Sequence, residues 1–118
     1  MRPTETVYVI LCVVAISVGQ ILFKLTASST QPSGSAFGFV LHALLNPYLV
    51  SGLALYGVAT IAWVWLLRSI PLNVAYPFMS LAFIFVPLLS HVVFQEPFKL
   101  THAIGGGLII VGVTIASR

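Results

Sequence analysis

Four long apolar runs, separated by short polar stretches, dominate the hydropathy pattern of this chain of 118 residues. A bilayer core of about 30 Å needs roughly 20 consecutive apolar helical residues. The four runs therefore predict transmembrane helices at about 6–25, 48–67, 73–94 and 100–117. The pattern predicts an all-α membrane protein, with residues 1–118 forming a single four-helix transmembrane domain.

The first connection, between the first two runs, carries a pattern of its own. Its second half repeats apolar residues at the spacing of one helix stripe, namely Phe37, Val40, Leu41, Leu44 and Leu45. This predicts an amphipathic interfacial helix at about 36–45, with Ser35 as its cap and Asn46-Pro47 as its stop. A simple membrane anchor is the favoured interpretation, and a cover for a cavity entrance is the alternative.

The remaining connections are short and set the expected arrangement. Ser69 to Leu72 form the turn between the second and third runs, with Pro71 near the start of the third helix, which predicts that these helices are antiparallel neighbours. Four spans place both termini on one side of the membrane. The basic residues on that side slightly outnumber those on the other, which favours cytoplasmic termini, with dual topology as the open alternative: Arg2, Arg68 and Arg118 against Lys24 and Lys99.

Composition supports the membrane assignment and excludes several functions. Hydrophobic residues make up 59% of the chain and charged residues 6%, against about 25% charged residues in soluble proteins. The net charge of +3 comes from scattered residues, so no nucleic-acid surface is expected. The first run is too long for a cleaved signal peptide. The chain has a single cysteine, Cys12, which excludes an intrachain disulfide. Its three histidines lack the spacing of a metal site.

The third run combines apolar residues with features that an inert span would avoid. Pro77 and Pro87 each remove a backbone hydrogen bond and bend the helix. Tyr76, Ser80, Pro87 and His91 lie close to whole turns of a helix from one another and so share a predicted polar face. Freed backbone groups are tolerated in lipid only where protein or water covers them. The face is therefore expected to line a cavity, which predicts a transporter.

Polar residues also follow one face of the first run. Ser17, Gln20 and Lys24 are spaced by three and four residues, and Gly19 beside them allows a close approach. Polar groups inside a bilayer usually mark function, which favours substrate binding. The alternatives are that Lys24 extends to the interface and that Gln20 forms an interhelical hydrogen bond.

The charged residues at the ends of the runs are candidates for substrate binding. Lys24 and Glu96 are expected at the same membrane face, where they form an ion pair or bind opposite charges of one ligand, a phosphate and an amine. Arg68, at the opposite face, either holds a phosphate or follows the positive-inside trend. No Asp or Glu lies inside a predicted span, which argues against proton-driven export of cationic drugs.

Glycines define a further candidate surface on the fourth run. Gly105 and Gly112 lie seven residues apart on one helix face, and Gly106 follows the first of them. Small residues let helices approach closely in lipid, so these positions predict a dimer contact, with packing inside the chain as the alternative. No motif of a known enzyme is present, so no catalytic residue and no cofactor is assigned.

Several of these motifs together resemble the four-helix members of the drug/metabolite transporter superfamily. Small multidrug resistance exporters carry a Glu in their first helix where this chain has Ile16. The chain looks more like the small subunits of the undecaprenyl-phosphate aminoarabinose flippase, on the residues Gly19, Gln20, Lys24, Pro71, Ala75, Tyr76, Pro77, Ser80, Leu81, Glu96 and Pro97 and on the run GGGLIIVG.

The resemblance implies movement of a polyprenyl-phosphate-linked sugar across the bacterial inner membrane in support of lipid A modification. Its implied partners are membrane lipid, the lipid-linked sugar phosphate and a second subunit, in a homodimer or a heterodimer with a related four-helix chain. A small exporter of cationic or amphipathic compounds is one alternative. A non-transporting membrane assembly subunit is the other.

Overall fold

The computed structural model describes residues 2–30 and 34–117, and within these ranges every regular element is a helix. In chain order the helices are α1 (Pro3–Ser29), α2 (Ala36–Leu44), α3 (Pro47–Leu67), α4 (Leu72–Ala75), the 3-10 helix η1 (Tyr76–Leu81), α5 (Ala82–Phe94) and α6 (Leu100–Ala116). Three helical regions are long and apolar enough to cross a membrane: α1, α3 and the continuous region Leu72–Phe94. The fourth apolar helix, α6, is shorter, with 17 residues.

Local capping explains where the first helices begin and end. The Ser35 hydroxyl accepts a hydrogen bond from the Gly38 amide at 3.1 Å and caps α2, as the sequence predicts. Asn46 is the N-cap of α3, and its Oδ1 accepts from the Tyr48 amide at 2.9 Å. The first helix continues to Ser29, four residues beyond the predicted end of the first span at 25. Lys24 therefore lies more than one turn inside α1.

Close packing of α1 on α3 depends on glycines at their contact. A Cβ added to Gly52 of α3 would lie 3.2 Å from Cβ of Leu22 and 3.0 Å from the ring of Phe23 on α1. A Cβ added to Gly19 of α1 would lie 3.5 Å from the ring of Tyr56. In lipid, helix association depends on such close contacts because no hydrophobic force drives it. The small size of these glycines therefore lets α1 and α3 hold together.

The region Leu72–Phe94 is helical throughout but not uniformly α-helical. It changes to a 3-10 helix at Tyr76–Leu81, which contains Pro77, and Pro87 lies inside α5. The Ser80 hydroxyl donates to the carbonyl of Pro77. A 3-10 helix turns about 120° per residue, about 20° more than an α-helix. The segment η1 therefore rotates the faces of α5 relative to those predicted from a regular α-helix.

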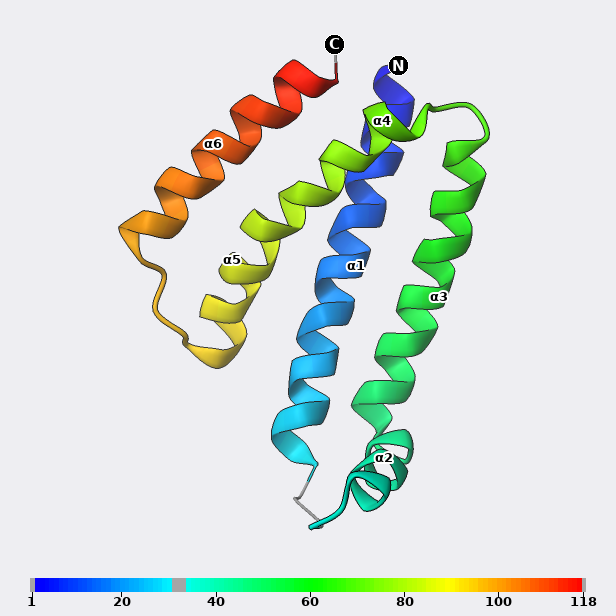
Figure 1. The fold of residues 1–118 in the computed structure, drawn as a ribbon, viewed down its shortest axis with the longest axis vertical. Coiled ribbons are helices and arrows are strands. Elements are labelled where there is room, and N and C mark those ends of the chain that lie inside the picture. The colour runs from blue at the N-terminus through cyan, green and yellow to red at the C-terminus, as the bar shows by residue number, and fades with distance from the viewer. Residues whose placement is uncertain (1, 31–33, 118) are drawn as a thin grey trace.

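The helices form an open arrangement in which α1 is central (Figure 1). Helix α3 packs on one side of α1, and η1 and α5 pack on another. Helix α6 packs mainly on η1 and has weaker contact with α5. The prediction that the second and third spans are antiparallel neighbours is met only where Leu66 shares the core with Ala75 and Phe78. Along the rest of their length α1 is the main partner of both α3 and α5. The molecule measures 49 × 36 × 20 Å, so its thinnest dimension is about two helix diameters.

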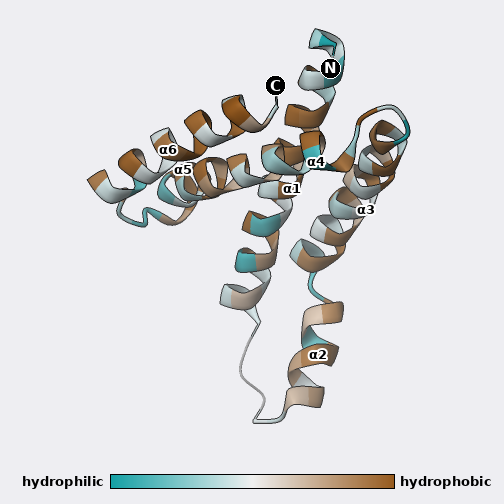
Figure 2. Ribbon diagram, turned by 45° about the horizontal axis from the view of Figure 1, so that its top comes forward, coloured by the Kyte–Doolittle hydropathy of each residue, from teal (hydrophilic) through white to brown (hydrophobic). Residues whose placement is uncertain are grey.

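The buried core lies toward the end of the molecule that holds both termini. Its residues come from α1, the end of α3, the segment between α3 and α4, α4, η1 and α6: Val9, Cys12, Val13, Leu66, Ile70, Ala75, Phe78 and Val113. Elsewhere many large apolar side chains are exposed, among them residues of α3 and α6, two helices whose ribbons are largely hydrophobic in Figure 2. Of an 18-residue apolar window in each helical region, only 17% is buried within the chain in α3 and only 11% in Leu72–Phe94. Most of the apolar surface is therefore free to contact lipid or another protein.

Candidate functional site

A groove between α1 and α5 contains one polar side chain, Gln20. Its volume is about 350 Å³, and it is lined by Ile16, Gln20, Ala82, Phe83, Val86 and Pro87. Proline has no N–H, so Pro87 leaves the carbonyl of Phe83, four residues earlier, without its usual helical donor. The exposed amide of Gln20 thus shares the groove with both residues of this break in the α5 hydrogen-bond ladder. The groove opens at the surface of the molecule and offers a polar position between apolar walls.

The three predicted polar residues of α1 occupy different environments. Ser17 is fully buried, and its hydroxyl donates to the carbonyl of Val13 at 2.8 Å. Gln20 lines the α1–α5 groove, and Lys24 is exposed one turn further along α1. The hydrophilic bands in the half of α1 that lies away from the termini are visible in Figure 2. Of these three residues, Gln20 and Lys24 are accessible to a ligand and Ser17 is not.

The end of α5 forms a compact polar turn around Glu96. The Ser90 hydroxyl donates to Oε2 of Glu96, and Nδ1 of His91 lies 2.7 Å from the Glu96 carbonyl oxygen. Gln95 makes this turn possible with a left-handed backbone, at φ 58°. Ser90 was missed by the sequence analysis, because it is one apolar-flanked serine inside a span. Its partner lies across the helix end, which hydropathy does not reveal.

Lys24 and Glu96 do not meet, although both lie toward the end away from the termini. Across residues 2–30 and 34–117 the Lys24 side chain forms no hydrogen bond and no ion pair. The Glu96 carboxylate is instead held by Ser90. Lys24 and Glu96 therefore form no ion pair with each other, and the Lys24 ammonium is available to an anion.

The predicted polar face of the third span does not form one stripe. Tyr76 is 64% exposed at the start of η1, whereas Ser80 is half-buried and bonded to Pro77. Four residues of 3-10 helix place Ser80 about 120° around the axis from Tyr76, instead of about 40° in an α-helix. Pro87 lines the α1–α5 groove, and His91 belongs to the turn around Glu96.

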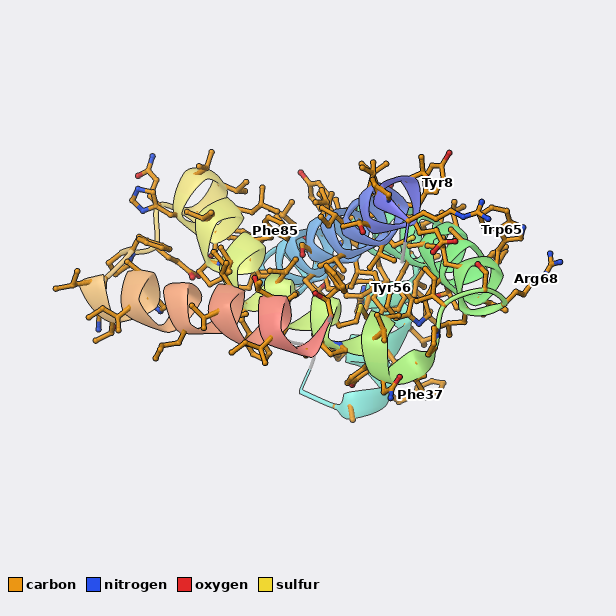
Figure 3. All side chains as sticks on the ribbon, turned by 90° about the horizontal axis from the view of Figure 1, so that it is seen from above. Tyr8, Phe37, Tyr56, Trp65, Arg68 and Phe85 are labelled. Carbon is orange, nitrogen blue, oxygen red and sulfur yellow. The ribbon has the colours of Figure 1, made fainter. Side chains whose placement is uncertain are left out.

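Arg68 lies at the other end of the molecule, just after α3. It is exposed, and with Trp65 and Ser69 it lines a shallow pocket of about 210 Å³. Figure 3 shows Arg68 and Trp65 projecting to the same side, away from the body of the molecule.

The glycines of α6 divide into two groups. A Cβ added to Gly106 would lie 3.3 Å from Ile84, so this buried glycine packs within the chain. A Cβ added to Gly105 or Gly112 would meet no atom within 4 Å. These two positions leave a face of α6 open to another chain, while Gly106 does not contribute to an outer surface.

A second polar site, which the sequence analysis missed, joins the end of α1 to the start of α3. Nδ2 of Asn46 donates to the Ser29 hydroxyl at 2.7 Å, and also lies 3.4 Å from the Thr30 hydroxyl. The sequence contains no pattern that predicts this hydrogen bond, apart from the tendency of Asn46-Pro47 to form a turn. Within the described ranges no group of three or more His, Cys, Asp or Glu side chains could hold a metal ion.

These features define a small multi-pass α-helical membrane protein with a polar position in a groove open to the bilayer. The chain belongs to the EamA-like transporter family, whose model matches residues 1–118.

Several flippase subunits share much of the sequence. A probable 4-amino-4-deoxy-L-arabinose-phosphoundecaprenol flippase subunit ArnE from Pseudomonas fluorescens is 34% identical over 85% of each chain. The subunit of that name from an Escherichia coli strain is 36% identical over 80% of this chain and 91% of its own. One from Enterobacter is 41% identical over 58% of this chain, and the match spans only 64% of that relative. No solved structure matches.

Proposed function

We propose that this chain is a flippase subunit that moves a polyprenyl-phosphate-linked sugar, of the aminoarabinose type, across the bacterial inner membrane for lipid A modification. The observation that carries the proposal is the laterally open α1–α5 groove with Gln20 inside it and Lys24 one turn beyond. The similarity to flippase subunits over most of the chain supports the same substrate class.

A lipid-linked substrate makes demands that this groove meets. Its chain stays in the bilayer, so the path must open sideways to lipid, and its headgroup needs polar partners inside an apolar wall. Gln20 provides an amide in the groove, and Lys24 provides a cation that has no partner among the described residues. Lys24 then binds the phosphate and Glu96 the amine of the sugar, because both lie toward the same end of the molecule.

The proposed membrane arrangement uses α6 as the fourth crossing. Its 17 residues span about 25 Å, which a thinner or locally adapted bilayer accommodates. Both termini then lie on one side, in agreement with their shared end in Figure 1, and we expect that side to be the cytoplasm. The substrate passes by alternating access between two such subunits, identical or related, since the α1–α5 groove of one chain is open at the surface.

Transport in liposomes tests the role of Lys24. The purified protein, alone and with a related four-helix subunit, is reconstituted with an undecaprenyl-phosphoryl aminosugar, and the lipid reaching the opposite leaflet is quantified. We expect Lys24→Gln to reduce transport at least about tenfold, because a charge-assisted hydrogen bond to phosphate is lost. Lys24→Arg should retain much of the activity, and Lys99→Gln should match wild type.

The controls separate a wrong substrate from a missing partner. Each variant must retain the helix content and monodispersity of wild type. Transport that needs the second subunit and depends on Lys24 supports a heterodimeric flippase. If wild type and Lys24→Gln move the lipid equally well, the phosphate role of Lys24 is excluded. If neither the single chain nor the pair moves it, the substrate assignment fails.

A further inference from the structure

A second groove runs between α1 and α3, toward the end of the molecule that holds the termini. Its volume is about 290 Å³, and its walls are apolar almost throughout, with Leu11 and Ala15 on α1 and Val58 and Ala62 on α3. Leu11 is 57% exposed and Val58 is 67% exposed, so the groove is open at the surface. Both helices are long enough to span a membrane, which places this surface in contact with hydrocarbon chains.

Two aromatic rings mark the end of this groove nearest the termini. Tyr8 of α1 and Trp65 of α3 both line it, and their rings meet edge-to-face with centroids 6.5 Å apart. Tyr and Trp collect at the boundary between hydrocarbon and headgroups, because they combine an apolar ring with a polar atom. The pair therefore indicates the depth at which the groove reaches the headgroup region.

A cation lies just beyond the aromatic pair. Arg68 follows Trp65 by one helical turn, about 5 Å further along the axis. Its side chain is exposed and has no hydrogen bond or ion pair in the part of the chain that the structure describes. Figure 3 shows Tyr8, Trp65 and Arg68 on one side of the molecule. Along α3 the order is thus apolar groove, aromatic pair, free guanidinium.

We propose that this groove and Arg68 bind a phosphate-bearing membrane lipid, with one hydrocarbon chain between α1 and α3 and the phosphate on the guanidinium. A lipid presents the same order along the bilayer normal, from chain to interface to phosphate. The guanidinium matches phosphate oxygens with two parallel hydrogen bonds. The site uses a different helix pair from the α1–α5 groove and the opposite end of the molecule from Lys24, so it stands independently of the transport proposal.

Native mass spectrometry of the purified full chain in detergent tests the site, with undecaprenyl phosphate as the probe. Undecaprenol has the same chain without phosphate, and inorganic phosphate has no chain, so both should bind at least about tenfold more weakly than the probe. Arg68→Gln should weaken binding of the probe by a similar factor, and Arg68→Lys should restore part of it. Lys99→Gln is the matched control and should bind like wild type.

Variants that fill the groove test whether a hydrocarbon chain of the lipid binds between α1 and α3. Ala62→Phe should lower probe affinity while leaving the charge in place, and Val58→Trp, at an exposed position, repeats the test with less risk to folding. Helix content and monodispersity must match wild type. The proposal is overturned if undecaprenol binds as well as its phosphate, if Arg68→Gln has no effect, or if the groove variants change only self-association. The transport proposal gives Lys24 a polyprenyl phosphate as well, so the probe can occupy two sites. Lys24→Gln should leave the binding that depends on Arg68 and on the α1–α3 groove intact, and Arg68→Gln should leave the binding that depends on Lys24, so the two proposals fail separately.

Discussion

Asn46 shows how one side chain fixes the relation of two helices. Its Oδ1 accepts from the Tyr48 amide and caps α3, while its Nδ2 donates to Ser29 at the end of α1. Because the connection between these residues is long, a direct hydrogen bond between the helix ends limits how far they can separate. Asn46 therefore acts at both ends of the first connection at once.

Replacing Asn46 by Ala should lower the free energy of unfolding by about 1–2 kcal/mol, because a helix cap and a donor to Ser29 are both lost. Asn46→Asp keeps the acceptor for the cap but not the donor, so it should fall between Ala and wild type. The measurement is the unfolding midpoint in mixed detergent. Asn73→Ala, at an exposed position whose side chain has no hydrogen-bond partner among the described residues, should be neutral. Equal losses at both asparagines would contradict the role given to Asn46.

The contact of α1 with α3 illustrates the element scale. These helices approach closely where Gly52 faces Leu22 and Phe23. Another glycine on the same helix, Gly57, faces outward, and a Cβ added to it would meet no atom within 4 Å. The two glycines share a helix and differ in what surrounds them, so they form a matched pair.

Gly52→Ala should be less stable than Gly57→Ala by about 1–3 kcal/mol. Both changes remove the same backbone entropy penalty of glycine, about 1 kcal/mol in a helix. Only the Cβ at position 52 crowds the neighbouring helix, and overpacking costs about 1–3 kcal/mol. Thermal unfolding in detergent, followed by circular dichroism, measures the difference. Indistinguishable midpoints for the two variants would show that the α1–α3 contact tolerates a wider spacing.

At the scale of the whole molecule, the open arrangement leaves much apolar surface uncovered. One face of α6 exposes Leu100, Ile104, Leu108, Val111 and Ile115. Gly105 and Gly112 lie beside it with free space above them, while Gly106 is covered by Ile84. A second subunit that approaches along Gly105 and Gly112 would cover this face and complete a path that a single chain does not enclose.

Cysteine cross-linking in membranes tests this contact. In a Cys12→Ala background, Gly112→Cys should form a disulfide-linked dimer with mild oxidant, because this side of α6 meets its equivalent in a second copy. Gly107→Cys is the control: it is also exposed and uncrowded, but it lies on the other side of the buried Gly106. Cross-linking at 107 instead of 112 would place the contact on the opposite side. Cross-linking of 112 only with a related subunit would indicate a heterodimer.

The positions of the helices could be predicted from the amino-acid sequence, because helix formation in a membrane follows from local properties. Apolar runs of sufficient length, the hydroxyl of Ser35 before the interfacial stripe and the prolines of the third span are all readable in order along the chain. The helix Ala36–Leu44 begins directly after Ser35, and the 3-10 helix Tyr76–Leu81 contains Pro77. Family motifs such as Gly19-Gln20 and Glu96-Pro97 likewise need no tertiary information.

Which of these helices and side chains lie in contact follows from the tertiary structure alone. The hydropathy pattern does not show which helices are neighbours. It therefore could not predict that α1 lies between α3 and α5, or that Asn46 donates a hydrogen bond to Ser29. Regular α-helical periodicity placed Tyr76 and Ser80 on one face, whereas the tighter turn of η1 moves them apart. The groove that ends at Tyr8 and Trp65 exists because α1 packs against α3, and that depends on contacts between residues far apart in the chain.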